Sequence, residues 1–349
     1  MDDQEQKHKR RIRYKGTHPK TFKEKYKELQ PERYADAVEK AISRGSTPAG
    51  MHRPICVKEI LGALRIVPGQ TGFDATLGYG GHTVEMHGCL GSKGHIYAVD
   101  VDPYELPRTK ERLERLGYGP EIMTVIRMNF SKIDQVVLES GPFDFILADL
   151  GVSSMQIDDP DRGFSFKREG PLDLRLDPTR GKSAAVRLKT ISQDEFQGML
   201  TENADEPYAK EIARAVVSEI KKGTDISTTT QLKKIIESAL GSIPEKNRKE
   251  ETKRSCQRCF QALRIDVNNE FEMLYEFLEK LPAVLAKGGR VAILSFHSGE
   301  DRLVKKSFQR FFREGVYSEI APGPIRPSPE ECASNSRAGS AKLRWAVKA

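Results

Sequence analysis

Short apolar runs bounded by turn residues recur along the chain, and segments with helical periodicity separate them. The runs have the length and composition of buried strands. They lie at 72–77, 95–101, 123–128, 143–150 and 290–296. Amphipathic helices are expected at 56–64, 103–116 and 131–139, and one long helix at about 257–285. Because strands and helices alternate, the pattern predicts a doubly wound α/β fold with a mostly parallel sheet.

The interval between the fourth and fifth predicted strands is far too long for a plain crossover helix, since it runs from residue 150 to residue 290. Segments 193–222 and 229–240 inside it show helical periodicity, with Asp and Thr near their starts. We therefore expect an inserted helical subdomain that recognises the substrate. The expected domains are an extension at 1–50, a core at 51–156, the insertion at 157–256, and the rest of the core at 257–349.

Composition and charge limit the function classes. The chain has 349 residues, of which 38% are hydrophobic, so it can form a sizeable core. It contains no apolar run long enough to span a membrane and no signal-peptide pattern at the N-terminus, so we expect a cytoplasmic protein. Five cysteines without a second CxxC pair predict no zinc site, and we expect no metal. A net charge of +7 and the many basic residues in 1–30 favour a polyanionic partner, and a disordered solubilising tail is the alternative for 1–30.

The stretch D-A-T-L-G-Y-G-G-H-T at 74–83 follows the first predicted strand. Gly78, Gly80 and Gly81 form a strand–glycine–helix corner, where a ligand can approach bare backbone. Asp100 ends the second strand and is placed to accept the hydroxyls of a ribose. The corner lacks the G-x-G-x-x-G order of dinucleotide sites, so S-adenosylmethionine fits better. A tight turn without a ligand is the alternative.

The fourth strand ends at Asp149, which would lie close to the transferred methyl group and its acceptor. A turn-capping aspartate is the alternative interpretation. The segment 155–177 that follows is dense in charged and aromatic residues and shows no periodicity. Ordering such a loop costs conformational entropy, which favours a functional role.

The motifs taken together resemble the RsmH (MraW) family of bacterial methyltransferases, over about residues 52–348. They include D-x-T-x-G-x-G-G-H at 74–82, D-L-G-V-S-S-x-Q-x-D at 149–158, R-G-F-S-F at 162–166, G-P-L-D-x-R at 170–175, F-Q-A-L-R-I-x-V-N at 260–268, S-F-H-S-x-E-D-R at 295–302 and S-A-K-L-R at 340–344. The resemblance implies a Rossmann-like class I methyltransferase that transfers a methyl group from S-adenosylmethionine to the N4 amino group of a decoding-centre cytosine in 16S rRNA. The cofactor contacts that it implies are Gly80, Gly81, His82, Asp100, Phe130, Asp149 and Gln156.

The acceptor chemistry assigns further roles. The lone pair of a cytosine amino nitrogen is delocalised into the ring, so hydrogen-bond acceptors must localise it, and Asp149 is the leading one. His297 is a second catalytic hypothesis, as a group that orients the base or relays a proton; a histidine that only hydrogen-bonds a loop is the alternative. Phe164 or Phe166 is expected to stack on the base, and the alternative is that both only pin their loop to the core.

Arginines are expected to contact the RNA backbone, although some will pair with nearby acids instead. With Phe164 and Phe166, the predicted RNA-contacting residues are Arg162, Arg175, Arg258, Arg264 and Arg302. The expected partner is 16S rRNA within the small ribosomal subunit, and the oligomeric state, including a homodimer, is left open. The segment 253–259 departs from the family pattern. A divergent paralogue acting on another RNA or amino acceptor, and a catalytically silent ribosome-assembly factor, therefore stay open as alternatives.

Overall fold

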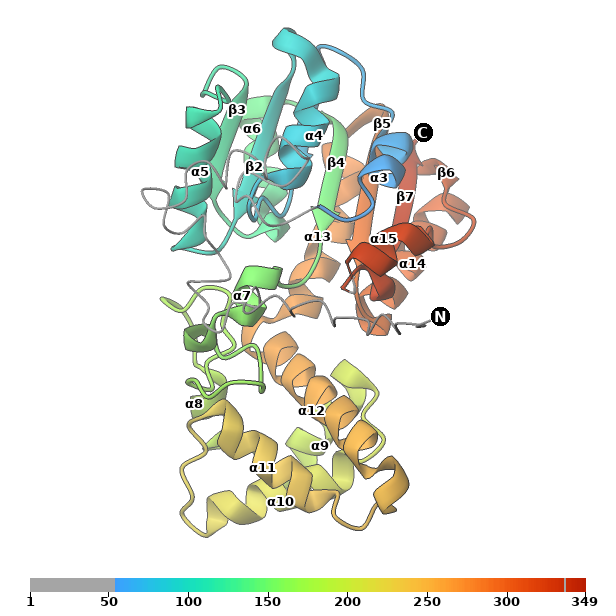
Figure 1. Cartoon of the computed structure of the whole chain (residues 1–349). Helices are drawn as coiled ribbons and strands as arrows, with labels where there is room; N and C mark the ends of the chain where they lie inside the picture. The colour runs from blue at the N-terminus through green and yellow to red at the C-terminus, as the bar shows by residue number, and fades with distance from the viewer. Residues whose placement is uncertain (1–53, 336) are drawn as a thin grey trace, which may run out of the picture.

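The computed structural model describes residues 54–335 and 337–349, so the basic extension expected at 1–50 lies outside the described residues. A mixed sheet with helices on both faces forms the upper part of the molecule in Figure 1, and a helical insertion lies below it. The two parts meet where the strands β1 and β4 end.

The sheet has seven strands in the order β3-β2-β1-β4-β5-β7-β6. Their bounds are β1 (Thr71–Asp74), β2 (His95–Asp100), β3 (Met123–Arg127), β4 (Phe143–Asp149), β5 (Leu285–Ser295), β6 (Tyr317–Ile320) and β7 (Lys342–Lys348). The first five strands pair in parallel, and β7 runs antiparallel to both β5 and β6. The predicted doubly wound, mostly parallel sheet is confirmed. The strand prediction omitted β6 and β7, which form its antiparallel edge.

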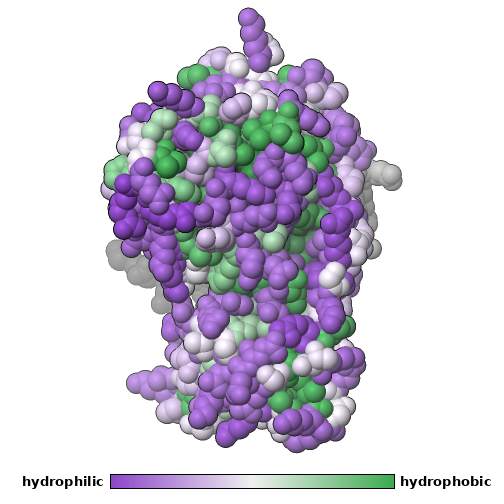
Figure 2. Space-filling view, turned by 180° about the vertical axis from the view of Figure 1, so that it is seen from behind, coloured by the Kyte–Doolittle hydropathy of each residue, from purple (hydrophilic) through white to green (hydrophobic). Residues whose placement is uncertain are grey.

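Two hydrophobic clusters cover the two faces of the sheet. Helices α3 (Val57–Leu64), α4 (Gly81–Leu90) and α5 (Glu105–Arg115) supply one of them. Helices α6 (Ile133–Ser140), α13 (Glu270–Val284) and α14 (Ser298–Arg313) supply the other. The short helix α15 (Pro329–Ser334) precedes β7. The face drawn in Figure 2 is mostly hydrophilic, and hydrophobic residues gather on it in patches, one of them in the upper part of the view. Among the described helices, none is both long enough and apolar enough to cross a membrane.

The insertion is built on a separate hydrophobic cluster. After α7 (Ser154–Asp158) it comprises α8 (Ala184–Leu188), α9 (Gln193–Ala204), α10 (Ala209–Lys221), α11 (Thr229–Ala239) and α12 (Glu245–Asn268). Its core includes Phe196, Ile212, Leu232 and, from α12, Cys256 and Phe260. Residue 256, where the sequence placed the end of the insertion, therefore falls in the middle of α12.

The single helix expected at about 257–285 is wrong. Asn269 adopts a left-handed conformation (φ +49°), ends α12 and begins α13. Asn is one of the few residues that tolerate this region, because its short side chain can hydrogen-bond locally. The break lets α12 belong to the insertion while α13 packs on the sheet, and β5 then starts at Leu285 rather than at residue 290.

The chain leaves β1 toward β2 and β3 on one side, and later enters β4 and β5 on the other. Ligands of such sheets bind at the carboxyl ends of the strands beside this reversal of strand order. The insertion lies over the same edge (Figure 1), so a ligand there would be enclosed between the sheet and the helical part.

Gly72 shows how closely β1 and β4 pack. A Cβ atom at this position would lie 2.0 Å from Cζ of the buried Phe145 on the neighbouring strand. Gly72→Ala is therefore expected to lower the free energy of unfolding by about 1–3 kcal/mol, as measured by denaturant titration. The control is Gly62→Ala in α3, where a Cβ atom meets nothing within 4 Å and the change should stabilise by about 0.5–1 kcal/mol. A Gly72→Ala protein as stable as the wild type would contradict this packing.

Candidate active site

A cavity of about 750 Å³ opens between the carboxyl edge of the sheet and the insertion. The loops that follow β1, β2, β3, β4 and β5 form its upper wall. The loop residues 164–167 and the α12 residues Gln257, Phe260, Gln261 and Arg264 line its lower side. The cavity is thus the place where the predicted cofactor residues and the insertion come together.

The glycine corner after β1 is held by a buried carboxylate. Asp74 is 1% exposed, and its Oδ2 accepts a 2.5 Å hydrogen bond from Oγ1 of Thr83 in α4. Gly78 (φ +49°) and Gly80 (φ +77°) both take left-handed conformations, which glycine adopts without the steric cost of a Cβ atom. Gly78, Gly81 and His82 line the cavity. Gly80 packs against Leu113, just behind the lining.

Asp100 ends β2 and faces the glycine corner. Its Oδ2 accepts a 2.8 Å hydrogen bond from the backbone N–H of Gly78, and its Oδ1 accepts one from the N–H of Asp102. Each oxygen keeps a second lone pair, so the carboxylate can still accept ligand hydroxyls. Phe130, after β3, forms an apolar part of the cavity wall and packs edge-on against Phe277.

Asp149 ends β4 at the centre of the cavity wall. Its backbone N–H donates to Oγ1 of Thr76, and its Oδ2 lies 3.4 Å from Nδ1 of His82. Its Oδ1 is buried and has no hydrogen-bond partner among the residues that the structure describes. Buried carboxylate oxygens are almost always hydrogen-bonded in native proteins. The unpaired oxygen therefore points to a ligand as its missing partner.

His82 links Asp149 to the segment before α3. Its Nε2 lies 2.9 Å from the carbonyl oxygen of Ile55, which can only accept, so Nε2 carries the ring proton. Nδ1 faces the Asp149 carboxylate at 3.4 Å. Burial raises the pKa of Asp149 to about 6, and the charge of His82 opposes this shift. Burial and His82 thus act on the Asp149 carboxyl in opposite directions.

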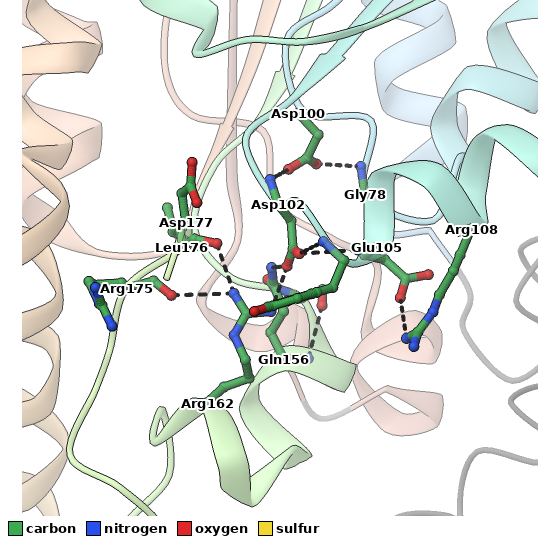
Figure 3. Close-up of polar contacts among 12 residues, drawn as sticks. Gly78, Asp100, Asp102, Glu105, Arg108, Gln156, Arg162, Arg175, Leu176 and Asp177 are labelled. Atoms are coloured by element: carbon green, nitrogen blue, oxygen red, sulfur yellow. Dashed lines mark hydrogen bonds and ion pairs between the residues drawn. The ribbon is translucent and has the colours of Figure 1, made fainter. Parts of the chain in front are cut away.

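A second buried carboxylate, Asp102, joins four segments of the site (Figure 3). Its Oδ1 accepts from the backbone N–H groups of Tyr104 and Glu105, and its Oδ2 accepts from Nε2 of Gln156 (2.9 Å) and Nη1 of Arg162 (2.7 Å). Burial acts to raise the pKa of Asp102, but the charge and hydrogen bonds of Arg162, together with Gln156, hold it below the ordinary value. Asp102 is therefore ionised.

Two of the predicted contact residues work inside this network. Gln156 lines the cavity, but its Oε1 accepts from the N–H of Ser153 and its Nε2 is taken by Asp102. Arg162 was expected on RNA; its side chain is only 12% exposed, and its Nη2 donates to the carbonyl oxygens of Arg175 and Leu176. Arg162 thus ties the loop that carries Phe164 to the tip of β2.

Phe164 and Phe166 both line the cavity. Phe164 is 9% exposed and lies 5.6 Å beneath the Arg162 guanidinium, while Phe166 packs against Phe260 of α12 with ring centroids 5.5 Å apart. Both rings also contact the hydrophobic core of the insertion. The two interpretations from the sequence, a base-stacking role and a loop-pinning role, are compatible in this geometry.

His297 follows β5 and lines the cavity within a network of buried charges. Its Nδ1 accepts from the backbone N–H of Glu300, which places the ring proton on Nε2. Nε2 lies 3.1 Å from Oε1 of Glu300, but it is buried and forms no hydrogen bond with the residues that the structure describes. Burial acts to raise the pKa of Glu300, but His297 and Arg264 lower it overall. Arg264 also lines the cavity, and it forms a bidentate ion pair with Glu270.

The other predicted RNA-contacting arginines lie outside the cavity lining, and each pairs with an acid. The nitrogen–oxygen distances are 2.7 Å for Arg175–Asp173, 3.7 Å for Arg258–Glu206 and 3.4 Å for Arg302–Asp205. Arg302 keeps 53% of its side chain exposed, whereas that of Arg175 is 19% exposed. Of the three, Arg302 is the most accessible to a large ligand.

Two described clusters hold their ligand-type atoms close enough together for a metal ion. In the cluster of Glu270, His297 and Glu300, Arg264 already takes both oxygens of Glu270. In the cluster around Cys56, burial raises the pKa of the thiol to about 12, and Oε1 of Glu331 already accepts from the backbone N–H of Cys56. Neither set of donors favours a metal.

Several lining residues were missed by sequence reasoning. Lys167 and Gln257 line the cavity, and Asp102 organises it, yet none of the three was predicted as a site residue. Asp102 stands in the same strand-end motif as Asp100. Lys167 directly follows R-G-F-S-F, and this position is the signal that could have identified it.

If Arg162 ties the loop to β2, Arg162→Lys should release it, because an ammonium group cannot reach Asp102 and two carbonyl oxygens at once. Hydrogen exchange of the amides in 164–176 should become faster by about tenfold or more, as measured by mass spectrometry, since each charge-assisted hydrogen bond contributes about 1.5–3 kcal/mol. The control is Arg180→Lys, since Arg180 is 84% exposed and should leave exchange unchanged. Equal exchange in the two variants would show that Arg162 does not hold the loop.

The chain is similar to known proteins over most or all of its length. The chain is 76% identical over its whole length to ribosomal RNA small subunit methyltransferase H 2 of Alkaliphilus metalliredigens, with all of both chains covered. It is 68% identical to ribosomal RNA small subunit methyltransferase H 1 of Lachnoclostridium phytofermentans, over 100% of this chain and 95% of that one. Ribosomal RNA small subunit methyltransferase H of Halorhodospira halophila is 38% identical over 88% and 97% of the two chains. The family model of the MraW methylases matches residues 49–349, and the chain belongs to this family.

Proposed function

We propose that this protein transfers a methyl group from S-adenosylmethionine to the N4 amino group of a decoding-centre cytosine in the 16S rRNA of the small ribosomal subunit. Family membership makes the chain an S-adenosylmethionine-dependent rRNA methyltransferase. The single observation that carries the chemistry is the buried, unpaired Oδ1 of Asp149 on the cavity wall. The reaction would take place in the cytoplasm, where small subunits are assembled.

The upper wall of the cavity fits the cofactor. Gly78 and Gly81 leave bare backbone beside the carboxylate of Asp100, which has lone pairs free for the ribose hydroxyls. Phe130 supplies an apolar wall for the adenine. His82 lies beside the same corner and orients Asp149. Gly80 lies behind the residues that line the cavity, so it would affect the cofactor only through the backbone conformation of the glycine corner.

Gln156 contributes to the cofactor site through Asp102. Its amide connects α7 to the carboxylate after β2, so it fixes the position of the segment that follows Asp149. A partner that orients a ligand-binding group in this way is a positioning residue rather than a direct contact.

Asp149 would act on the acceptor amine. S-adenosylmethionine supplies, when bound, a methyl carbon activated by a positive sulfonium. The ionised Oδ1 of Asp149 would accept a hydrogen bond from the cytosine amino group and localise the nitrogen lone pair toward that carbon. As the carbon–nitrogen bond forms and the carbon–sulfur bond breaks, the nitrogen loses one proton. Asp149, with a pKa of about 6, can take this proton and release it near neutral pH.

The lower wall would hold the base. Phe164 and Phe166 present aromatic surface in the cavity, and Gln257 adds hydrogen-bonding groups from α12. A cytosine must leave its stack to enter such a cavity, and aromatic side chains can replace the stacking that it loses. His297 would orient the base, because its Nδ1 is fixed by the backbone N–H of Glu300 while its buried Nε2 has no hydrogen-bond partner among the described residues.

The arginines that pair with acids divide into two roles in this proposal. Arg162, Arg175 and Arg264 would shape the loop and the cavity wall, because their guanidinium groups are mostly buried in ion pairs. Arg302, and to a smaller extent Arg258, keep exposed surface and would contact RNA phosphates.

The test is to incubate the purified protein and labelled S-adenosylmethionine with small subunits that lack the N4-cytosine modification, and to identify the product by nucleoside mass spectrometry. Labelled N4-methylcytidine is expected from small subunits, with free 16S rRNA, large subunits and tRNA as parallel substrates. Label in another nucleoside or another RNA would contradict the proposal and support the alternative that the protein is a divergent paralogue. Cofactor binding without transfer to any substrate would favour the silent assembly factor.

A further inference from the structure

Helix α12 carries a polar stripe that starts in the cavity and continues away from it. Five residues share one helix face because they follow one another at intervals of three, four or seven. They are Lys246, Lys249, Lys253, Gln257 and Arg264. Gln257 and Arg264 line the cavity, whereas the three lysines lie beyond its edge and are exposed.

The lysine end of the stripe carries unbalanced positive charge. Within the part of the chain that the structure describes, Lys246, Lys249 and Lys253 form no ion pair. Glu250 follows Lys246 by four residues on this face, and Arg254 pairs with it at 2.6 Å. Lysines that only increase solubility are commonly interspersed with acids, and the stripe has none free.

The opposite side of α12 is fixed in the core. Cys256, Cys259 and Phe260 are buried in the hydrophobic cluster of the insertion, so the helix cannot rotate to present another face. In Figure 1, α12 runs from the lower end of the insertion up to the core. The distance along the helix from Gln257 to Lys246 is about 16 Å, at 1.5 Å per residue.

We propose that this lysine stripe, Lys246–Lys249–Lys253, is the surface along which the rRNA strand flanking the target nucleotide lies. The inference rests on the proposed function and adds the direction in which the RNA leaves the cavity. A single-stranded segment whose base enters the cavity must continue over its edge, and α12 offers the ammonium groups that neutralise its phosphates. The stripe gives affinity, and the cavity selects the base.

The test replaces all three lysines by glutamine, which keeps length and helix propensity, as Lys246→Gln/Lys249→Gln/Lys253→Gln. The control variant Lys210→Gln/Lys221→Gln/Lys234→Gln removes the same charge from exposed positions of α10 and α11, which do not line the cavity. Binding to small subunits that lack the modification is measured at several salt concentrations, with S-adenosylhomocysteine affinity as a check on the core.

The stripe variant is expected to lower the slope of log affinity against log salt by about 2 to 3, because each lost phosphate contact removes about 0.7–0.9. Between 50 and 200 mM salt, the wild type should lose roughly 16- to 60-fold more affinity than the stripe variant. KM for the subunit should rise while kcat and cofactor affinity stay unchanged. The control should keep the wild-type slope.

Equal slopes in the wild type and the stripe variant would overturn the inference, as would equal losses in the stripe and control variants. Binding is measured separately from methyl transfer, so the two proposals fail differently. If the wild type binds small subunits but forms no N4-methylcytidine, the proposed function fails while the slopes still decide the role of the stripe. If methylation is normal and the slopes are equal, only the stripe is refuted.

Discussion

The carboxylate of Asp102 holds the site together, because it joins the sheet to the loop beneath it. It lies two residues after β2, caps the start of α5 through two backbone N–H groups, and binds Gln156 and Arg162 from segments more than fifty residues away. Removing one partner of such a buried ion pair costs about 3–5 kcal/mol, because the other charge is left uncompensated. The position of Phe164 in the lower wall therefore depends on the charge of Asp102 at the edge of the cofactor site.

Asp149 illustrates the opposite use of a buried acid. Its Oδ1 has no partner among the described residues, and burial raises its pKa to about 6. Because its pKa is raised from the ordinary value of 3.8, this acid lowers the stability of the fold progressively as the pH rises from about 4 to about 6, and the full cost remains at higher pH. Thr76 and His82 hold this residue in place nonetheless. The Asp149 carboxylate, which lowers the stability of the fold, is also the group that can accept a hydrogen bond from the substrate.

The sequence was informative wherever short-range patterns decide structure. The first five strands, the long insertion and the glycine corner follow from apolar runs and turn residues. Asn269 was missed because one residue with a left-handed conformation interrupts a helical pattern without changing it. Asp102, two residues after the end of β2, was missed because its partners Gln156 and Arg162 lie on distant segments. For the same reason Arg162 was assigned to RNA, although its partners are a carboxylate and two carbonyl oxygens of this chain.

The most direct test of the account is the pH dependence of a single turnover with saturating S-adenosylmethionine and small subunits. Because the carboxylate must be ionised to accept the amino hydrogen, the wild-type rate should rise with pH through about 6 and then level off. Asp149→Asn should bind the cofactor normally, lose at least about 100-fold in rate, and show no such rise. A wild-type rate that is flat from pH 5 to pH 8, or an Asp149→Asn protein with a near-normal rate, would contradict the central role of this carboxylate.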